Sequence, residues 1–574
     1  MGSALCRLGV RGYDRVAIAL PNGPDIAAVF LGVASYATCA PLNPSLQSDE
    51  FEFYLTDLCA NAIVLPADEG SPARDVAKRL GVAVLELERS REVAGLFALR
   101  GVSDDVNPPA NWGAGEDVAL VLHTSGTTSR PKQVPLSHDN LCTSARCIAH
   151  VLSLTSADRC LNVMPLFHIH GLVGVLLSSL SAGGSVICSA GFENDSFADL
   201  MKHRQPTWYS AVPTIHQSVL ALAKERPEVA TNDNLRLIRS SSSSLPPSVM
   251  AELEAVFKVP VIESYGMTEA AHQMASNPLP PAERKPGSVG VPAGPEMAIM
   301  DDDGGLLLAG QTGEIVIRGQ SVTAGYVNNA EANDSAFTDG WFRTGDLGCK
   351  DDENYFFLTG RKKEMVNRGG ENISPREIDE VLLDHPSVAQ AVAFAVPHPT
   401  LGEDVVAAVV LHNLDAVSEK DLRQFAFARL AAIKVPSQIL TVDSIPKGPT
   451  GKLQRIGMHE KLAADLQSHH VPPRNDLEKS IIAVVKQVLE TSRVGVTDNF
   501  FALGGDSLKA ARVLARLCDE FQVELPAVSV FLNPTPEQLS LEITRVLGEE
   551  TGLLDELLDE IELMSDEEAR RQVA

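Results

Sequence analysis

Short apolar runs alternate with helical patterns over most of residues 15–345. The run Arg15–Leu20 is typical of a buried strand, and the segment Asp25–Tyr36 that follows has the apolar spacing of a helix. Strands that alternate with helices predict a parallel α/β sheet. Further strands of this kind are expected at Ala119–Leu122, Val186–Cys188 and Pro260–Glu263.

The pattern becomes rich in strands near Glu314–Arg318, which predicts a small β-barrel at the end of a large α/β domain spanning 1–360. A shorter α+β segment is expected at 361–460. The polar, proline-containing stretch 461–475 is typical of a linker. Residues 476–548 have a helical pattern throughout.

The segment 549–574 is predicted to be an acidic amphipathic tail. Residues 551–574 carry eight acidic residues against two arginines, and Leu554, Leu557, Leu558 and Ile561 have helical spacing. Two interpretations stay open. The tail is either a solvated helix that caps the preceding domain or frays, or a docking segment for a partner.

Charge and cysteine usage narrow the function classes. The 574 residues carry a net charge of −27, which argues against non-specific binding of nucleic acid or of anionic membranes. The nine cysteines include no CxxC pair, so a reducing, cytoplasmic setting is expected. No segment approaches the roughly 18 apolar residues that a membrane span requires, and the first residues do not have the pattern of a secretory signal.

Five polar motifs carry the candidate chemistry, and the first two follow apolar strands. The segment Thr124–Lys132 (TSGTTSRPK) comes directly after a strand and combines small residues, hydroxyls and a lysine. Such a loop can approach phosphate oxygens closely, although the spacing is not that of a Walker loop. A polar turn without a ligand is the alternative. The other four are Glu263–Glu269 (ESYGMTE), Trp341–Asp346 (WFRTGD), Gly360–Glu371 (GRKKEMVNRGGE) and Pro446–Lys452 (PKGPTGK).

Taken in this order, the five motifs resemble the adenylate-forming superfamily, which includes acyl-CoA synthetases, peptide-synthetase adenylation domains and luciferases. The resemblance implies an AMP-forming acid–thiol ligase that uses ATP and Mg²⁺, with a mobile α+β C-terminal subdomain. Lys132 and Thr268 would contact the phosphates, Glu269 would hold Mg²⁺, and Lys452 would stabilise the charge on the α-phosphorus. The other implied nucleotide-binding residues are Thr124, Ser125, Gly126, Thr127, Thr128, Glu263, Ser264, Tyr265 (against adenine), Asp346 (at the ribose) and Arg361.

The same resemblance implies a rotation between two half-reactions. Lys363 matches the hinge of the family, and Gly369 and Gly370 match its thiol tunnel. The sequence departs from the family in two places. Gln133 stands where Pro-Lys is usually followed by glycine, so it is expected to slow or reshape the first loop. Relatives also carry a further strand–helix unit before residue 9, so the chain looks shortened at its start.

The segment Asp498–Leu508 (DNFFALGGDSL) resembles the phosphopantetheine attachment motif of acyl and peptidyl carrier proteins. Ser507 would open a helix of a four-helix carrier domain, where the helix dipole favours a phosphate. An ordinary helix-capping serine is the alternative. A carrier implies a phosphopantetheinyl transferase and a separate enzyme that accepts the acyl group, because the chain contains no recognisable condensation, reductase or thioesterase domain.

Several stretches further resemble oxalyl-CoA synthetases, which suggests a small and doubly acidic substrate. They are residues 122–132, 164–172, 207–216, 238–245, 268–280 and 367–375. Ser242, Ser243 and His272 are expected to donate to a second carboxylate, with His168 as a gate residue. For His272 the alternative is a histidine that only supports the site, and for the serines it is a loop without a ligand.

The leading hypothesis is a carrier-loading enzyme, in which the acid becomes an acyl-adenylate and is then transferred to the pantetheine thiol on Ser507. Two alternatives stay open. The first is a ligase that releases free acyl-CoA, with CoA as a further cofactor. The second is a catalytically silent carrier or docking module, which the short N-terminus and Gln133 would explain.

Overall fold

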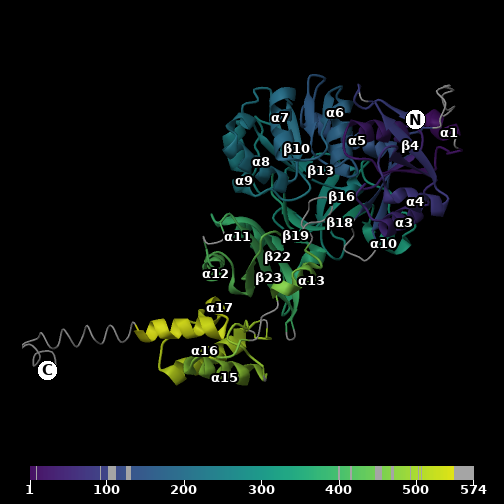
Figure 1. Cartoon of the computed structure of the whole chain (residues 1–574). Helices are drawn as coiled ribbons and strands as arrows, with labels where there is room; N and C mark the ends of the chain where they lie inside the picture. Colours follow the sequence, from purple (N-terminus) through teal and green to yellow (C-terminus); the bar gives the residue numbers. More distant parts are fainter. Residues whose placement is uncertain are drawn as a thin grey trace, which may run out of the picture. The chain divides into compact units, whose positions relative to one another are not determined.

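The chain forms two compact units, of which the first comprises residues 1–363 and the second begins at Glu364 (Figure 1). The phosphate-loop residues Ser125 to Thr128, Lys452 and the tail 549–574 lie outside the described residues. The computed structural model describes residues 1–7, 9–90, 92–100, 112–124, 131–398, 401–413, 417–446, 455–466, 471–491, 493–501, 503–505 and 507–548.

The first sheet has seven strands in the order β5-β4-β3-β1-β2-β6-β7. Its central strands are parallel, while β5 and β7 pair antiparallel at the two edges. The central strands are buried, as expected for a parallel sheet covered on both faces. The bounds are β1 Arg15–Ile18, β2 Thr38–Pro41, β3 Ala62–Pro66, β4 Ala83–Arg89, β5 Phe97–Leu99, β6 Val118–Thr124 and β7 Lys132–Ser137.

The second sheet also has seven strands, in the order β14-β13-β12-β11-β10-β8-β9. Strands β8 to β12 are parallel, and β13 turns back antiparallel to β12. Gly266 is needed at this turn, because a Cβ there would lie 1.6 Å from the His272 carbonyl oxygen. The bounds are β8 Arg159–Asn162, β9 Ser185–Cys188, β10 Trp208–Ala211, β11 Leu237–Ser240, β12 Val261–Met267, β13 His272–Ser276 and β14 Val291–Pro292.

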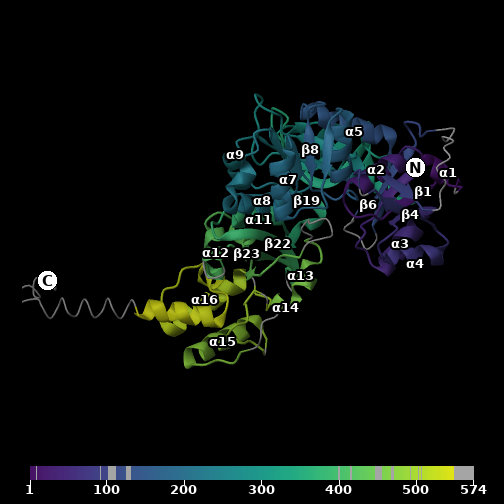
Figure 2. The same cartoon turned by 45° about the horizontal axis from the view of Figure 1, so that its top comes forward.

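Helices cover the outer faces of both sheets and fill the space between them. The helices α3 and α4 pack on the outer face of the first sheet (Figure 2). The apolar side chains of α2, α5 and the π-helix η1 form a core that reaches both sheets. On the other side, α7, α8 and α9 cover β10 and its neighbours (Figure 1). The bounds are α1 Gly2–Arg7, α2 Pro24–Ala34, α3 Ser48–Asp57, α4 Pro72–Leu80, α5 His138–Val151, η1 His170–Leu177, α6 Ser178–Ser181, α7 Asn194–Arg204, α8 Pro213–Glu225, η2 Pro227–Ala230, α9 Pro247–Phe257 and η3 Thr268–Ala270.

An antiparallel five-stranded sheet occupies the place where the sequence predicts a small barrel. Its strands run in the order β15-β16-β18-β17, with β19 paired to β18. The long strand β18 carries the Trp341–Asp346 motif, so its register fixes the position of Asp346. The bounds are β15 Glu296–Met300, β16 Gly313–Arg318, α10 Ala330–Ala336, β17 Phe337–Thr338, β18 Trp341–Lys350, β19 Phe356–Arg361 and η4 Lys362–Glu364.

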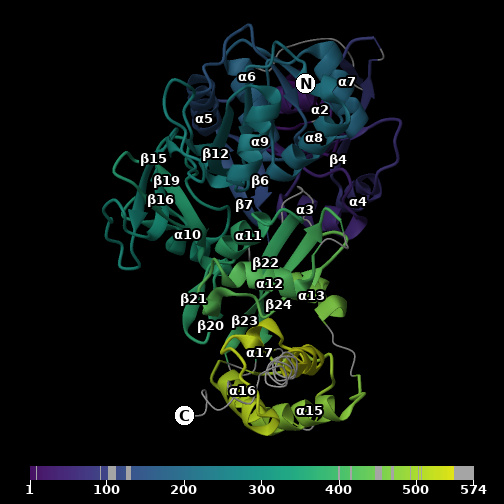
Figure 3. The same ribbon diagram turned by 90° about the vertical axis from the view of Figure 1, so that its left-hand side faces the viewer.

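The second unit starts with an α+β subdomain in which α11 and α12 pack on a sheet of order β21-β20-β23-β22, with β24 paired to β23 (Figure 3). The hairpin of β22 and β23 supplies most of its apolar core. The bounds are β20 Val366–Arg368, β21 Glu371–Ile373, α11 Pro375–Leu383, β22 Val388–His398, β23 Gly402–Leu411, α12 Glu419–Phe427, η5 Ala432–Lys434, β24 Gln438–Thr441, α13 Met458–Lys461 and α14 Ala463–Leu466.

The last described residues form a helical bundle with its own apolar core (Figure 3). Helix α15 spans Asp476–Leu489, α16 spans Ser507–Phe521, α17 spans Ser529–Leu532, and residues 536–548 are helical as well. Ser507 is thus the first residue of α16, as the attachment motif predicts. None of the helices in the described part of the chain is both long and apolar enough to cross a membrane.

Candidate active site

The carboxyl ends of the parallel strands in the second sheet carry part of the predicted site residues. The loops after β10 and β11 and the last residues of β12 meet at one edge of the sheet. Ser242 follows β11, and Tyr265 lies near the end of β12. In open α/β sheets this edge is where ligands bind.

Glu263 and Ser264 on β12 hold the serine-rich loop in place. The Leu245 amide donates to Glu263 Oε1 at 2.9 Å, and the Ser264 hydroxyl donates to the Ser240 carbonyl at 3.2 Å. In return, the Ser241 hydroxyl donates to the Ser264 carbonyl at 3.1 Å. These bonds fix the loop in a conformation where Ser242 has φ 76°, which costs free energy for a residue with a Cβ.

Tyr265, Asp346 and Arg361 form one hydrogen-bonded group. The Tyr265 hydroxyl donates to Asp346 Oδ2 at 2.5 Å, and Arg361 Nε donates to Asp346 Oδ1 at 2.7 Å. Burial raises the pKa of the Tyr265 phenol well above its usual range, so the hydroxyl keeps its proton and can donate. The sequence predicted adenine contact for Tyr265 and ribose contact for Asp346, and the structure joins both side chains directly.

Tyr326 connects two further predicted residues, Lys132 and Glu269. Its hydroxyl donates to Glu269 Oε1 at 2.9 Å, and Lys132 Nζ lies 4.3 Å from the centre of its ring. Burial is the main cause that raises the pKa of Glu269 and lowers the pKa of Lys132. A cation, an aromatic ring and a carboxylate are therefore held together, at two residues for which the sequence predicts contact with phosphates and Mg²⁺. Sequence reasoning missed Tyr326, which lies outside the five motifs.

Tyr326→Phe is expected to reduce the rate of ATP–pyrophosphate exchange about tenfold, because a buried carboxylate loses its donor. The phenylalanine ring keeps the contact with Lys132, so the loss should appear as a higher Mg²⁺ requirement. The measurement is exchange rate against Mg²⁺ concentration, with Tyr326→Leu as the variant that removes both contacts. An unchanged Mg²⁺ dependence in Tyr326→Phe would contradict the assigned contact.

A buried polar cluster lies beside the serine-rich loop. His170 Nε2 and the Ser210 hydroxyl are 2.7 Å apart, and His170 Nδ1 and the Ser242 hydroxyl are 3.1 Å apart. The rings of His170 and His272 stack with centroids 5.0 Å apart. Both Nη atoms of Arg239 donate to His272 Nε2 at 3.1 Å. The cluster thus runs from the half-buried Ser242 to the fully buried Arg239.

Arg239 gives this cluster its charge. Its other described partners are the Gln273 side-chain oxygen at 3.1 Å and the Ser210 hydroxyl at 3.5 Å, and its Nε has no hydrogen-bond partner among the described residues. Burial lowers the pKa of Arg239 to about 9. Because a guanidinium only donates, His272 Nε2 must accept, so the His272 proton resides on Nδ1. The group is a buried cation whose described partners are neutral.

The other predicted pocket residues, His168 and Ser243, contact members of this cluster through backbone groups. His168 Nδ1 accepts from the His170 amide at 3.3 Å, and it is His170 that contacts Ser242. Ser243 is exposed, and its hydroxyl donates to the Ser242 carbonyl at 2.9 Å. Gly174 on the π-helix leaves room for the His272 ring, since a Cβ there would lie 2.5 Å from His272 Nε2.

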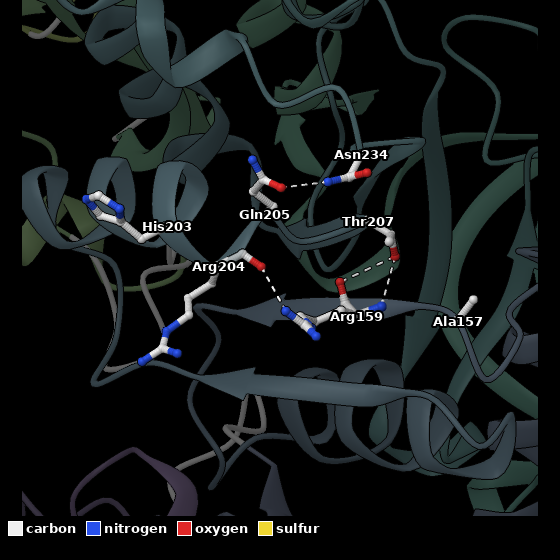
Figure 4. Close-up of a pocket in the computed structure, with 7 residues that line it drawn as sticks. All are labelled: Ala157, Arg159, His203, Arg204, Gln205, Thr207 and Asn234. Carbon is white, nitrogen blue, oxygen red and sulfur yellow. Dashed lines mark hydrogen bonds between the residues drawn. The ribbon is translucent and has the colours of Figure 1, made fainter.

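A polar pocket of about 300 Å³ lies elsewhere on the first unit (Figure 4). Arg159 begins β8 and Thr207 immediately precedes β10, so this pocket is at the amino ends of the parallel strands, opposite the candidate site. Its lining residues already bond to one another: Arg159 Nη1 donates to the Arg204 carbonyl, and Asn234 Nδ2 donates to Gln205 Oε1 (Figure 4). We therefore do not assign the nucleotide to it.

In the second unit, a series of hydrogen bonds connects Gly369 to the helical bundle. The Gly369 amide donates to the Leu401 carbonyl at 3.0 Å, and the Leu401 amide donates to His398 Nδ1 at 3.1 Å. His398 Nε2 lies 2.9 Å from the carbonyl oxygen of Phe501, which precedes Ser507 by six residues in the attachment motif. Asn499 adds a bond to the Ser437 carbonyl at 2.9 Å. Lys363, the predicted hinge, is the last residue of the first unit.

Comparison with known families accounts for most of the chain. Residues 1–327 match the AMP-binding enzyme family, and residues 377–452 match the AMP-binding enzyme C-terminal domain. Residues 479–543 match the phosphopantetheine attachment site family.

Similar proteins cover nearly the same part of the chain. An oxalate–CoA ligase of Arabidopsis thaliana is 45% identical over 453 residues, which are 78% of this chain and 88% of the relative. A probable CoA ligase of Humulus lupulus is 45% identical over 483 residues, 82% of this chain and 91% of the relative. Among solved structures, ATP-bound MatB from Rhodopseudomonas palustris has a TM-score of 0.73 at 30% identity and covers 80% of this chain and 90% of its own.

Proposed function

The chain belongs to the AMP-binding enzyme family, as an AMP-forming ligase with a phosphopantetheine carrier domain, and from this premise we propose that it loads a small, doubly acidic molecule onto its own Ser507. The premise confirms three sequence-based expectations: the adenylate-forming family, the α/β fold followed by a helical carrier, and the ligase activity. The substrate class and the transfer in cis are the proposal.

The proposed reaction has two steps. An oxygen of the substrate carboxylate attacks the α-phosphorus of ATP, and the bond to the leaving pyrophosphate breaks. The acyl group then passes from AMP to sulfur, as the C–O bond to AMP breaks, the C–S bond forms and the thiol proton goes to solvent. The phosphopantetheine on Ser507 would supply this thiol. No general base is required in the first step, because the carboxylate is itself the nucleophile.

The first unit supplies the described residues for the first step, and Lys452 of the Pro446–Lys452 motif would join them. Lys132 would contact the β,γ-phosphates, and Lys452 would stabilise the charge that develops on the α-phosphorus. The nucleoside would lie against Tyr265 and Asp346. A hard cation prefers oxygen ligands, and the buried carboxylate of Glu269 fits Mg²⁺, which would screen the phosphate charge.

The buried charge of Arg239 is the observation that carries the proposed substrate class. A guanidinium in the interior is costly without an anion, and its described partners are neutral. A second carboxylate at Ser242 and the two stacked histidines would provide the missing negative charge. The similarity to an oxalate–CoA ligase supports the same class.

Transfer in cis is supported by the hydrogen bonds that connect Gly369 to the attachment motif through His398. The residues that would form the thiol tunnel and the carrier belong to one compact unit. A tethered thiol reaches an effective concentration in the millimolar range, roughly, which favours it over dilute free acceptors. Loading requires a phosphopantetheinyl transferase beforehand and an acyl-accepting enzyme afterwards.

A second candidate function is release of free acyl-CoA, which the two relatives at 45% identity favour, because one is an oxalate–CoA ligase and the other a probable CoA ligase. In that case the carrier domain would be auxiliary. The acyl-adenylate step is common to both candidates.

A pyrophosphate-exchange screen tests the proposed substrate class. Oxalate, malonate and succinate are each compared with the monocarboxylic acid of the same length, namely acetate, propionate and butyrate. At least one diacid should support exchange about tenfold faster than its monoacid partner, because only the diacid neutralises Arg239. Equal or faster exchange with every monoacid would rule out the second-carboxylate assignment.

A further inference from the structure

Gln133 is buried and makes hydrogen bonds with both ends of its side-chain amide. Its Nε2 donates to the Asp57 carbonyl at 2.7 Å and to Asp57 Oδ2 at 2.6 Å. Its Oε1 accepts from Arg15 Nη1 at 3.0 Å. The donor end thus faces two oxygens and the acceptor end faces a guanidinium, which fixes the orientation of the amide. Only 6% of Gln133 is exposed.

Asp57 needs these donors because it is the last residue of α3. Its backbone carbonyl has no donor partner within the helix, and its carboxylate lies at the negative end of the helix dipole. His123 Nε2 makes the second side-chain contact with Asp57 Oδ2, at 2.9 Å. Burial is the main cause that lowers the pKa of His123, so the imidazole is neutral at neutral pH and carries its proton on Nε2.

His123 and Gln133 are direct cross-strand partners on β6 and β7. The two strands that flank the phosphate loop are therefore both fastened to the same carboxylate. The adjacent pair is Thr124 and Lys132, where the loop begins and ends. The strand ends on both sides of the loop are therefore held against α3.

Lys132 and Gln133 are neighbours in a strand, so their side chains point to opposite faces. Gln133 points to α3, and Lys132 points to the Tyr326 ring at 4.3 Å. The Val327 amide also donates to the Gln133 carbonyl at 3.1 Å, which connects β7 to the segment that carries Tyr326. Any movement of Gln133 along or across the strand would displace Lys132 from this position.

We propose that Gln133 is a positioning residue for ATP, which fastens β7 to α3 and thereby holds Lys132 where the β,γ-phosphates bind. Glycine, the residue that the related sequences are expected to have here, cannot make any of the three side-chain bonds. In this chain Gln133 replaces the close backbone approach of glycine with a side-chain anchor. The inference rests on the proposed role of Lys132, and its test separates the two.

The test measures dissociation constants of MgATP and of AMP by calorimetry, using the full-length protein without acid. Gln133→Gly is expected to weaken MgATP binding about tenfold, because hydrogen bonds to charged partners are lost. AMP lacks the β,γ-phosphates, so its dissociation constant should stay within about twofold. Gln133→Met keeps the buried volume, removes the hydrogen bonds and should show the same difference between the two nucleotides.

Two further variants complete the experiment. Gln311→Gly removes an exposed glutamine as the matched control and should bind MgATP like the wild type. Lys132→Ala tests the premise: unchanged MgATP binding there would overturn the role of Lys132. If Lys132→Ala weakened MgATP binding while Gln133→Gly and Gln133→Met bound it like the wild type, the role of Lys132 would stand. The proposed role of Gln133 would then be wrong. An equal loss for MgATP and AMP would also overturn it, since a purely structural defect would affect both.

Discussion

Ser507→Ala is expected to abolish the covalent acyl thioester on the protein while ATP–pyrophosphate exchange stays within about twofold of the wild type. The reason is that different domains carry out the two half-reactions, adenylation and thioester formation. The residues assigned to adenylation lie in the first unit and on the Lys452 loop, whereas Ser507 begins α16 of the carrier. The measurement is the intact mass of the holo protein with ATP and each acid, beside the exchange rate of the same preparation.

Ser480→Ala is the matched control for this experiment, because Ser480 lies on α15 of the same domain and should not affect loading. If Ser507→Ala lost exchange as well, the carrier would be required for adenylation and the separation would be wrong. Ser507→Ala could also release free acyl-CoA as fast as the wild type loads its carrier. That result would favour the second candidate function, a ligase that releases free acyl-CoA.

Arg239→Met is expected to raise the KM for a dicarboxylic substrate by about 10- to 100-fold, because the second carboxylate loses its buried counter-charge. The same variant should have little effect on the KM for ATP and should bring diacid and monoacid rates close together. The physical reason is specific to charge, because methionine fills a similar volume but leaves the second carboxylate without a counter-charge. The measurement is the ratio of kcat/KM for each pair of acids of equal length.

Arg239→Lys separates charge from geometry, since lysine keeps the charge but cannot donate twice to His272. It should recover part of the preference for the diacid. A variant Arg239→Met that retained the full diacid preference would show that the guanidinium serves only to support His272.

The sequence predicted the elements that local patterning determines. The buried runs at Arg15–Leu20 and Pro260–Glu263 became strands, and the glycine-bearing turn before Ser507 became the start of a helix, because apolar periodicity and capping are local properties. It also predicts site roles for Lys132, Glu269 and Asp346, through motifs that resemble a known family.

The remaining contacts depend on residues far apart in the chain. Arg239 meets His272 across β11, β12 and β13, and Tyr326 meets Lys132 from 194 positions away, so neither contact leaves a local pattern. His168 was the expected pocket histidine, while the turn into the π-helix brings His170 to Ser242. Gln133 was expected to slow or reshape the first loop, and only the positions of Asp57 and Arg15 give its side chain a role.

Transfer in cis is the central claim, and the most direct measurement is the rate of carrier loading at different protein concentrations. Holo protein is mixed with saturating ATP and the best acid of the exchange screen, and its intact mass is followed over a hundredfold dilution series, roughly. The account predicts a first-order rate constant that does not change with dilution. A rate constant that falls in proportion to protein concentration, or an absence of the acyl mass increase with every acid that supports exchange, would contradict it.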